Sequence, residues 1–171
     1  MLAKIVAKKK DGDMIKGSTG DFVSHRNTFH VTIDGEPDTC QPVLVNDLKA
    51  VFFVKSLKGS KAPHNRPPEK TSRGAQYTEK QIRVVFADNE VIEGYTHGLH
   101  MDRLGFFMTP LDPNDNNDRI FVVLSSVKSL YSDGKEVAIN SEAKSVQTCE
   151  LCGKKLDLSW KFCPFDGTRI K

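Results

Sequence analysis

Hydrophobic and polar positions alternate most clearly along residues 82–96. Val84 and Phe86 are two positions apart in an extended run that Asp88 and Asn89 then interrupt, and a second extended run follows. Period-two hydrophobicity on both sides of an Asp-Asn pair is typical of two antiparallel strands joined by a tight turn. We therefore expect a β-hairpin in this segment.

A copy of this hairpin lies 77 positions earlier in the chain. At that offset, and without a gap, identical residues align: Ile5, Asp11, Ile15, Gly17, Thr19, Arg26 and Phe29 with Ile82, Asp88, Ile92, Gly94, Thr96, Arg103 and Phe106. After a polar loop at 111–118 the alignment resumes with a slightly larger offset. A difference in length confined to a loop is what an internal duplication should leave, so we expect two copies of one unit.

Each copy contains five short extended segments. In the first copy we expect strands at 2–9, 13–20, 28–33, 42–45 and 50–55, with a helical turn at 45–49. In the second copy we expect strands at 80–87, 90–97, 105–109, 119–124 and 127–132. Short strands at close spacing with turn signals between them predict a mainly β fold, with one small barrel or sandwich per copy.

These patterns divide the chain into parts. The predicted domains are a first small β-barrel at 1–57, a basic linker at 58–79, a second small β-barrel at 80–132, a second linker at 133–148 and a separate module at 149–171. The first linker is rich in proline and lysine, which indicates an extended tether.

Each copy contains a pair of adjacent aromatic residues, Phe52-Phe53 in the first and Phe106-Phe107 in the second. Successive side chains of a strand point to opposite faces, so one member of each pair must face away from the core of its own copy. We expect these outward phenylalanines to pack the two copies against each other.

The C-terminal module contains two segments with metal-ligand spacing. Cys149 and Cys152 are three positions apart, as are Cys163 and Asp166, and Gly follows the second member of each pair. This spacing bends the backbone so that two side chains point at one ion, and thiolates with a carboxylate suit tetrahedral Zn²⁺. We expect a structural zinc site, with Asp166, a water or a histidine as the fourth ligand.

Composition limits the function classes. The net charge is +3, and its positive excess lies in the first linker rather than on a predicted folded face. No apolar run reaches the roughly 20 residues of a membrane helix, and clustered cysteines favour a reducing compartment, so we expect no membrane contact and a cytoplasmic location. No phosphate loop, nucleophile elbow or paired catalytic carboxylates appear, so we expect no enzyme.

The order of strands and turns resembles that of the Sm-like or SH3-like small β-barrel, and an Sm-like protein would bind RNA and form a ring. More closely, residues 47–55, 105–110 and 117–122 resemble an uncharacterised bacterial domain family of accessory regulatory proteins. The C-terminal segment, with Phe162-Cys163-Pro164-Phe165-Asp166-Gly167, resembles a zinc ribbon whose last cysteine is replaced by aspartate.

A rival interpretation is the PilZ domain, the barrel that binds cyclic di-GMP, but its two motifs do not occur in the chain. Arg26 and Arg103 precede aromatic residues in the two copies. They either pair with nearby acids or hold an anionic ligand.

The function expected from these features is a non-enzymatic adaptor that acts through protein contacts, for which exposed strand edges are candidate surfaces. A homo-oligomer is compatible with the sequence. The alternatives are a nucleic-acid-binding protein that uses the ribbon and the basic linker, and a PilZ-like receptor for cyclic di-GMP.

Overall fold

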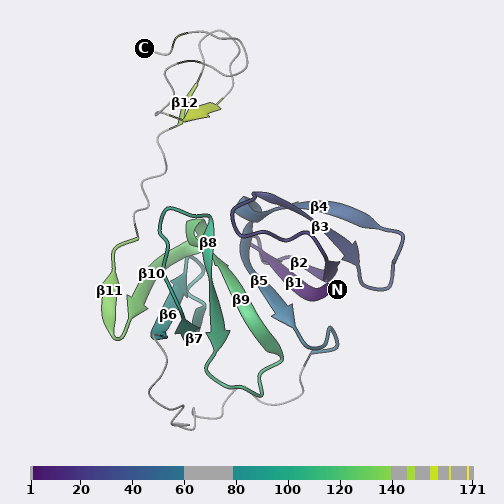
Figure 1. The fold of residues 1–171 in the computed structure, drawn as a ribbon, viewed down its shortest axis with the longest axis horizontal. Helices are drawn as coiled ribbons and strands as arrows, with labels where there is room; N and C mark the ends of the chain where they lie inside the picture. The colour runs from purple at the N-terminus through teal and green to yellow at the C-terminus, as the bar shows by residue number, and fades with distance from the viewer. Residues whose placement is uncertain are drawn as a thin grey trace. The chain divides into compact units, whose positions relative to one another are not determined.

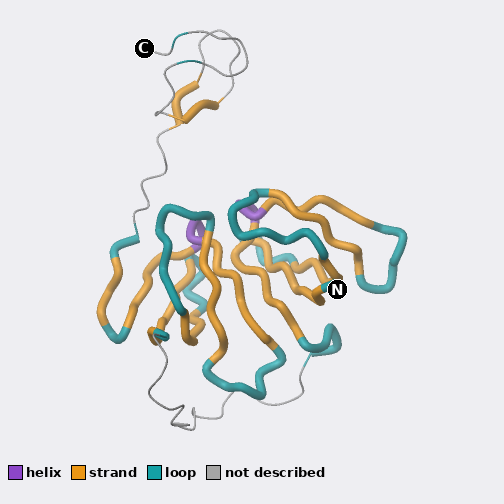
Figure 2. The backbone as a smooth tube through the Cα atoms, in the orientation of Figure 1, coloured by secondary structure: helices purple, strands orange, loops and turns teal. Residues whose placement is uncertain are grey.

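The structure is a computed structural model that describes residues 2–59, 79–139, 146–148 and 155–157, together with Phe162 and Arg169. The chain divides into two compact units, Met1–Ile139 and Asn140–Lys171. Most of the predicted linker at 58–79 lies outside the described residues. Strands predominate (Figures 1 and 2), which confirms the mainly β prediction.

The first half of the larger unit contains β1 (Ala3–Lys9), β2 (Met14–Thr19), β3 (Thr28–Ile33), β4 (Cys40–Leu44), the 3₁₀ helix η1 (Val45–Asp47) and β5 (Leu48–Val54). The second half contains β6 (Lys80–Phe86), β7 (Val91–Thr96), β8 (Gly105–Pro110), β9 (Asn117–Val123), η2 (Leu124–Ser126), β10 (Val127–Ser132) and β11 (Lys135–Val137).

All these strands form one antiparallel sheet of 11 strands, in the order β11-β10-β6-β7-β8-β9-β5-β1-β2-β3-β4. The first half has the internal order β5-β1-β2-β3-β4, and the second half has the matching order β10-β6-β7-β8-β9. The halves are joined where β5 pairs with β9, which Figure 1 shows side by side. The last strand of one half therefore continues the sheet of the other.

The hairpin expected at 82–96 is confirmed by the pairing of β6 with β7, in which Val85 lies opposite Val91. The turn between them places Asn89 at φ 65°. Gly12 takes a positive φ of 98° in the equivalent turn of the first half. Asn and Gly are the residues that adopt this left-handed conformation at least cost, which is why the two hairpins turn at these positions.

Close packing of β2 on β3 depends on a glycine, and so does that of β7 on β8. A Cβ atom at Gly17 would lie 2.1 Å from the carbonyl oxygen of Thr32, and one at Gly94 would lie 2.1 Å from that of Thr109. The obstacle is backbone in both cases, so no side chain could move aside. The glycines that the two copies share are therefore explained by sterics.

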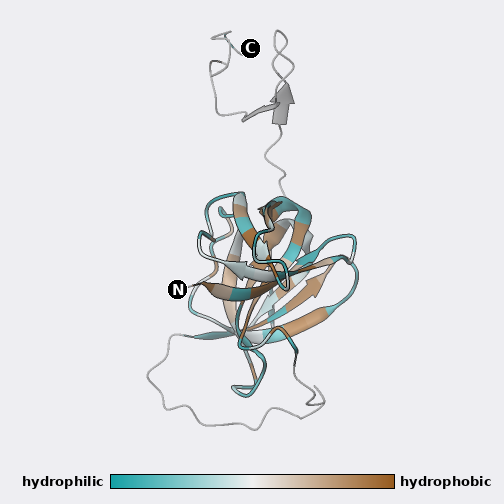
Figure 3. Ribbon diagram, turned by 90° about the vertical axis from the view of Figure 1, so that its right-hand side faces the viewer, coloured by the Kyte–Doolittle hydropathy of each residue, from teal (hydrophilic) through white to brown (hydrophobic). Residues whose placement is uncertain are grey.

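The unit has two hydrophobic cores, and β5 and β9 contribute to both. Phe53 belongs to the cluster that includes Phe29 and Ile5, whereas Phe52 packs against the cluster of the second half. Phe106 is likewise in the second cluster while Phe107 packs against the first. The predicted packing of the outward aromatic residues between the copies is confirmed. Figure 3 shows hydrophobic residues along the strands of the larger unit.

Some segments differ from the sequence prediction. β11 lies within 133–148, where a linker was expected, and pairs with β10 through a turn at Asp133 and Gly134, both with positive φ. The loop at 111–116 is not merely solvated. Lys55 Nζ, from the first half, donates hydrogen bonds to the carbonyl oxygens of Pro113 and Asp115 at 3.0 and 2.7 Å.

The open edge of the sheet at β4 is modified by a proline. Ile33 N donates to Thr39 O and Val45 N donates to Asn27 O, so alternate residues of β4 bond to β3. In that alternation the backbone of Pro42 faces away from β3, toward the open edge. Proline has no N–H, so the edge lacks a central donor for a further strand.

In the second half, Phe121 occupies the position that corresponds to Pro42, and it lies opposite Val51 of β5. The same strand position is therefore covered in one half and blocked in the other. At the other end of the sheet, β11 is only three residues long and carries Lys135 and Glu136. Short, charged or proline-containing edges are the usual protection against strand addition, so strand addition at these edges is disfavoured.

In the smaller unit, β12 (Val146–Thr148) pairs antiparallel with β13 (Lys155–Asp157), and Phe162 forms a bridge with Arg169. β12 also falls within the segment that was predicted as a linker.

Candidate anion-binding site

A surface hollow of about 260 Å³ lies where β7 ends and β8 begins. It is lined by Ser24 from the first half and by Thr96, His97, Gly98, His100, Arg103, Gly105, Phe106 and Phe107 from the second. The lining contains three side chains that can carry positive charge and no carboxylate. It is therefore suited to an anionic group.

The corresponding place in the first half holds a carboxylate of the chain itself. Asp21 Oδ1 accepts hydrogen bonds from the backbone N–H of His30 at 2.9 Å and from Thr19 Oγ1 at 3.1 Å. Asp21 Oδ2 lies 2.7 Å from His30 Nδ1. The backbone and then the side-chain hydrogen bonds from His30 lower the pKa of Asp21, so the carboxylate is held in its charged form.

In the second half the same scaffold is present without the acid. Thr96 matches Thr19, but Gly98 replaces Asp21 and Phe107 replaces His30. With no carboxylate beside it, the Thr96 hydroxyl lies 2.8 Å from the carbonyl oxygen of Phe107 and 3.1 Å from that of Gly98. The hollow therefore lies where the first half has its Asp21–His30 pair.

The positive side chains come from the loop between β7 and β8. His97, His100 and Arg103 are all exposed, and His97 Nε2 lies 3.1 Å from the carboxylate of Glu79, which offsets part of its charge. Arg103 is absent from the ion pairs found among the described residues. Its guanidinium is thus the strongest candidate to bind an anion.

The two arginines singled out in the sequence have different surroundings. Arg103 lines the hollow, whereas Arg26, although it matches Arg103 in the alignment of the copies, is exposed and is not among the lining residues. The sequence patterns did not predict His97, His100 or Gly98 as anion-binding residues. The exchange of Asp21 for Gly98 between the copies was the sequence signal that could have indicated the site.

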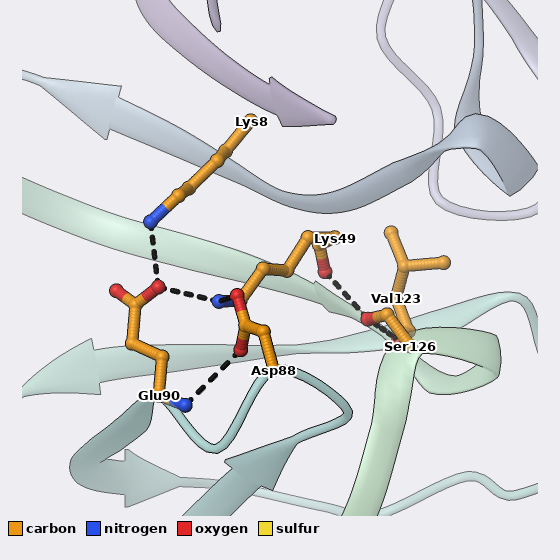
Figure 4. Close-up of polar contacts among 6 residues, drawn as sticks. All are labelled: Lys8, Lys49, Asp88, Glu90, Val123 and Ser126. Carbon is orange, nitrogen blue, oxygen red and sulfur yellow. Dashed lines mark hydrogen bonds and ion pairs between the residues drawn. The ribbon is translucent and has the colours of Figure 1, made fainter. Parts of the chain in front are cut away.

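A second polar cluster joins the halves and is structural. The side chain of Lys49 is only 4% exposed, and its ammonium group pairs with the carboxylates of Asp88 and Glu90 in the turn of the opposite half (Figure 4). Lys8 Nζ lies 2.6 Å from Glu90, and Lys49 Nζ lies 4.4 Å from the centre of the Phe86 ring. The cluster satisfies its own charges and leaves none for a ligand.

These contacts set the charge state of both acids. The hydrogen bond from the Lys49 side chain, followed by that from the Glu90 backbone, lowers the pKa of Asp88. Burial acts to raise the pKa of Glu90, but hydrogen bonds from Lys49 and Lys8 outweigh burial and leave that pKa lowered. Beside them, the buried Ser126 hydroxyl lies 2.9 Å from the Lys49 carbonyl oxygen, which fixes η2 against β5.

The predicted zinc ligands, Cys149, Cys152, Cys163 and Asp166, lie outside the described residues. In the part of the chain that is described, no cluster of three or more potential ligands is close enough to hold a metal ion. The remaining cysteine, Cys40, is exposed on β4. Among the described segments, none of the helices is long and apolar enough to cross a membrane.

Comparison with known proteins gives a family and no function. No curated protein and no solved structure matches the chain. Residues 1–132, which include β1 to β10 and the hollow, match the model of a family of unknown function. This agrees with the resemblance to an uncharacterised domain family seen in the sequence. The chain belongs to the family of unknown function DUF6982.

Proposed function

We propose that this protein is a non-enzymatic adaptor that binds an anionic group of a partner protein in the hollow at His97, His100 and Arg103. The observation that carries the proposal is the composition of the lining, which combines an arginine, two histidines and hydroxyl groups and lacks an acid. A charge-assisted contact to arginine gives both affinity and orientation.

The position of the hollow supports a binding role. It lies at the junction of the two halves, because Ser24 of the first half contributes to a lining built mainly by the second. Phe107, part of that lining, packs against the core of the first half. Packing of this part of the lining against a hydrophobic core preorganises it, and preorganised sites lose less entropy on binding.

We also propose how the two halves of the larger unit are built. Each half is proposed to be an Sm-like or SH3-like small barrel that arose by duplication, with boundaries near 57 and 80. The matching strand orders of the two halves support it, as do strand bounds that repeat along the chain. The β5–β9 pairing would then join the two units into one sheet.

The C-terminal module is proposed to be a zinc ribbon that holds Zn²⁺ through Cys149, Cys152, Cys163 and Asp166 and provides a second contact surface. The spacing of these residues supports it. The proposal includes a cytoplasmic location and no catalysis.

The test compares two arginines that occupy matching positions. Tagged wild-type protein, Arg103→Gln and Arg26→Gln are used to capture partners from cells of the source, and the recovered proteins are quantified. We expect Arg103→Gln to lose a specific partner that wild type and Arg26→Gln retain, because only Arg103 lines the hollow. Equal recovery by all three proteins contradicts the proposal.

Two further measurements separate the alternatives. Saturable binding of cyclic di-GMP that is lost in Arg103→Gln would replace the adaptor by a nucleotide receptor at the same hollow. Salt-sensitive retardation of RNA or DNA in a gel, unchanged by Arg103→Gln, would replace it by nucleic-acid binding elsewhere on the chain.

A further inference from the structure

The first half contains an internal model of an occupied site. Asp21 is bound there by a hydroxyl, a backbone amide and an imidazole, and each of these donors reaches one carboxylate. In the second half the chain supplies no acid, because Gly98 occupies the position of Asp21. The donors that remain around this position in the second half therefore determine what it can bind.

The hydroxyl remains, as Thr96, which lines the hollow. The backbone donor also remains. Leu124 N donates to Leu104 O, so Phe106 and Met108 bond to β9, while the backbone of Phe107 faces the other way. The pairs between β7 and β8 are Gly94 with Pro110 and Tyr95 with Thr109, so the N–H of Phe107 lies beyond that ladder. The Phe107 N–H corresponds to the backbone N–H of His30, which donates a hydrogen bond to Asp21 in the first half.

The imidazole donor is replaced rather than lost. Phe107 takes the place of His30, but His97, His100 and Arg103 line the same hollow. The second half thus retains the Phe107 N–H at the carboxylate position, together with a Thr96 hydroxyl that donates to backbone carbonyl oxygens when no ligand is bound, and gains one arginine and two imidazoles around it. A carboxylate accepts several N–H and O–H bonds at once, and each bond to a charged donor contributes more than a neutral one.

We infer that the group bound in the hollow is a carboxylate of the partner, placed where Asp21 lies in the first half. This inference rests on the proposed function for the location of the site and adds the chemistry that the site recognises. The carboxylate accepts from the Phe107 N–H and from the Thr96 hydroxyl, whose proton turns from the Phe107 carbonyl oxygen to the ligand, with Arg103 as its counter-charge. It comes either from an acidic side chain or from a chain terminus.

Gly98 provides a direct test, because it can accept a side chain. A Cβ atom at Gly98 would meet only His100, at 3.6 and 4.0 Å, which is ordinary van der Waals contact. Gly98→Asp should therefore fold and place a carboxylate where Asp21 lies in the first half. Gly98→Ala adds the same Cβ without the acid and is the matched control.

The experiment follows backbone amide resonances of the ¹⁵N-labelled full chain during titration with sodium acetate, with sodium chloride as the ionic-strength control. In wild type, acetate should shift the Phe107 amide saturably and chloride should not. In Gly98→Ala the amide should stay near its wild-type position without acetate and should respond less to acetate, because the added methyl group lies next to the carboxylate position. In Gly98→Asp the Phe107 amide should already be shifted without acetate and should not respond further. Arg103→Gln should raise the acetate concentration at half-saturation roughly tenfold, the usual effect of losing one charged hydrogen bond.

The inference is overturned if acetate moves Phe107 no more than chloride does, if phosphate moves it and acetate does not, or if Gly98→Asp still responds like wild type. Two further titrations identify which kind of carboxylate the partner supplies. N-acetylalanine offers a terminal carboxylate, and N-acetylaspartamide offers a side-chain carboxylate. Saturable binding of either compound supports the inference. If a partner is captured in an Arg103-dependent way but acetate gives no response, only the carboxylate inference is removed. An acetate response without such capture removes the adaptor function alone.

Discussion

Lys49 and Glu90 come from opposite halves of the chain and form an ion pair whose ammonium group is almost wholly buried. The partner acids are far more exposed, at 39% for Glu90 and 52% for Asp88. The pair joins the start of β5 to the turn between β6 and β7.

Removal of this lysine should destabilise the unit. We expect Lys49→Ala to lower the free energy of unfolding by about 2 kcal/mol, less than the loss of a fully buried pair, because both carboxylates can recover water. Lys128 corresponds to Lys49 in the second half and donates to Asn89 at 3.0 Å from an exposed position. Lys128→Ala should cost less than about 0.5 kcal/mol, and equal losses measured by urea unfolding would contradict this account.

Acid should weaken the same cluster. The folded-state pKa values of Asp88 and Glu90 lie below their ordinary values of 3.8 and 4.5. A lowered carboxyl pKa contributes stability that is complete above the ordinary value and is lost as the pH falls through the folded value. Urea unfolding should therefore show constant stability from this source between pH 6 and 5 and a decline below about pH 4.5.

A matched variant identifies the groups responsible for the acid response. Lys49→Met keeps the apolar length of the side chain and removes its charge, so the decline below that range should become shallower. An unchanged slope in Lys49→Met would mean that other carboxylates, such as Asp21, dominate the acid response.

The shared glycines should be intolerant of a methyl group. Gly17→Ala and Gly94→Ala each direct Cβ at a backbone oxygen 2.1 Å away, so we expect losses of about 3 kcal/mol or more, seen as reduced melting temperature or insoluble protein. Gly98→Ala, with its nearest contact at 3.6 Å, is the control and should remain folded. Near-wild-type melting of Gly94→Ala would show that β7 and β8 can separate without cost.

Pro42 should limit self-association at the β4 edge. Pro42→Val restores an outward N–H on an exposed strand, so sedimentation at increasing protein concentration should show association that wild type lacks. Gln41→Val adds a similar apolar side chain while the N–H of that residue still faces β3, and it should remain like wild type. Reducing conditions prevent crosslinking through the exposed Cys40. Equal behaviour of the two variants would remove the role assigned to Pro42.

The proposed zinc ribbon predicts one equivalent of zinc in the purified protein by metal analysis. Cys149→Ser should lose the metal and make the C-terminal module sensitive to protease, because a segment of this size has too little core to fold without the ion. Cys40→Ser, which changes the cysteine on β4, should keep its zinc. Metal-free wild-type protein would end the zinc proposal.

The sequence by itself determined the local β structure, because alternation and turn residues act between neighbours in the chain. The Asp88-Asn89 turn, the matching hairpin at Gly12 and one outward-facing phenylalanine in each pair were predictable from spacing alone. The structure identifies the outward-facing residues as Phe52 and Phe107. β11 was missed because three residues carry too little periodicity, although Asp133-Gly134 is a turn signal.

Only the tertiary structure decided how the halves combine. β5 pairs with β9, Lys49 becomes buried against the opposite turn, and Ser24 reaches the lining of the second half's hollow. Each of these contacts joins residues far apart in the chain, and no local pattern encodes such a pairing. The candidate site shows the same division, since the residue types of Thr96, Gly98 and Arg103 are written in the sequence. Their convergence on one open position depends on where β7 and β8 separate.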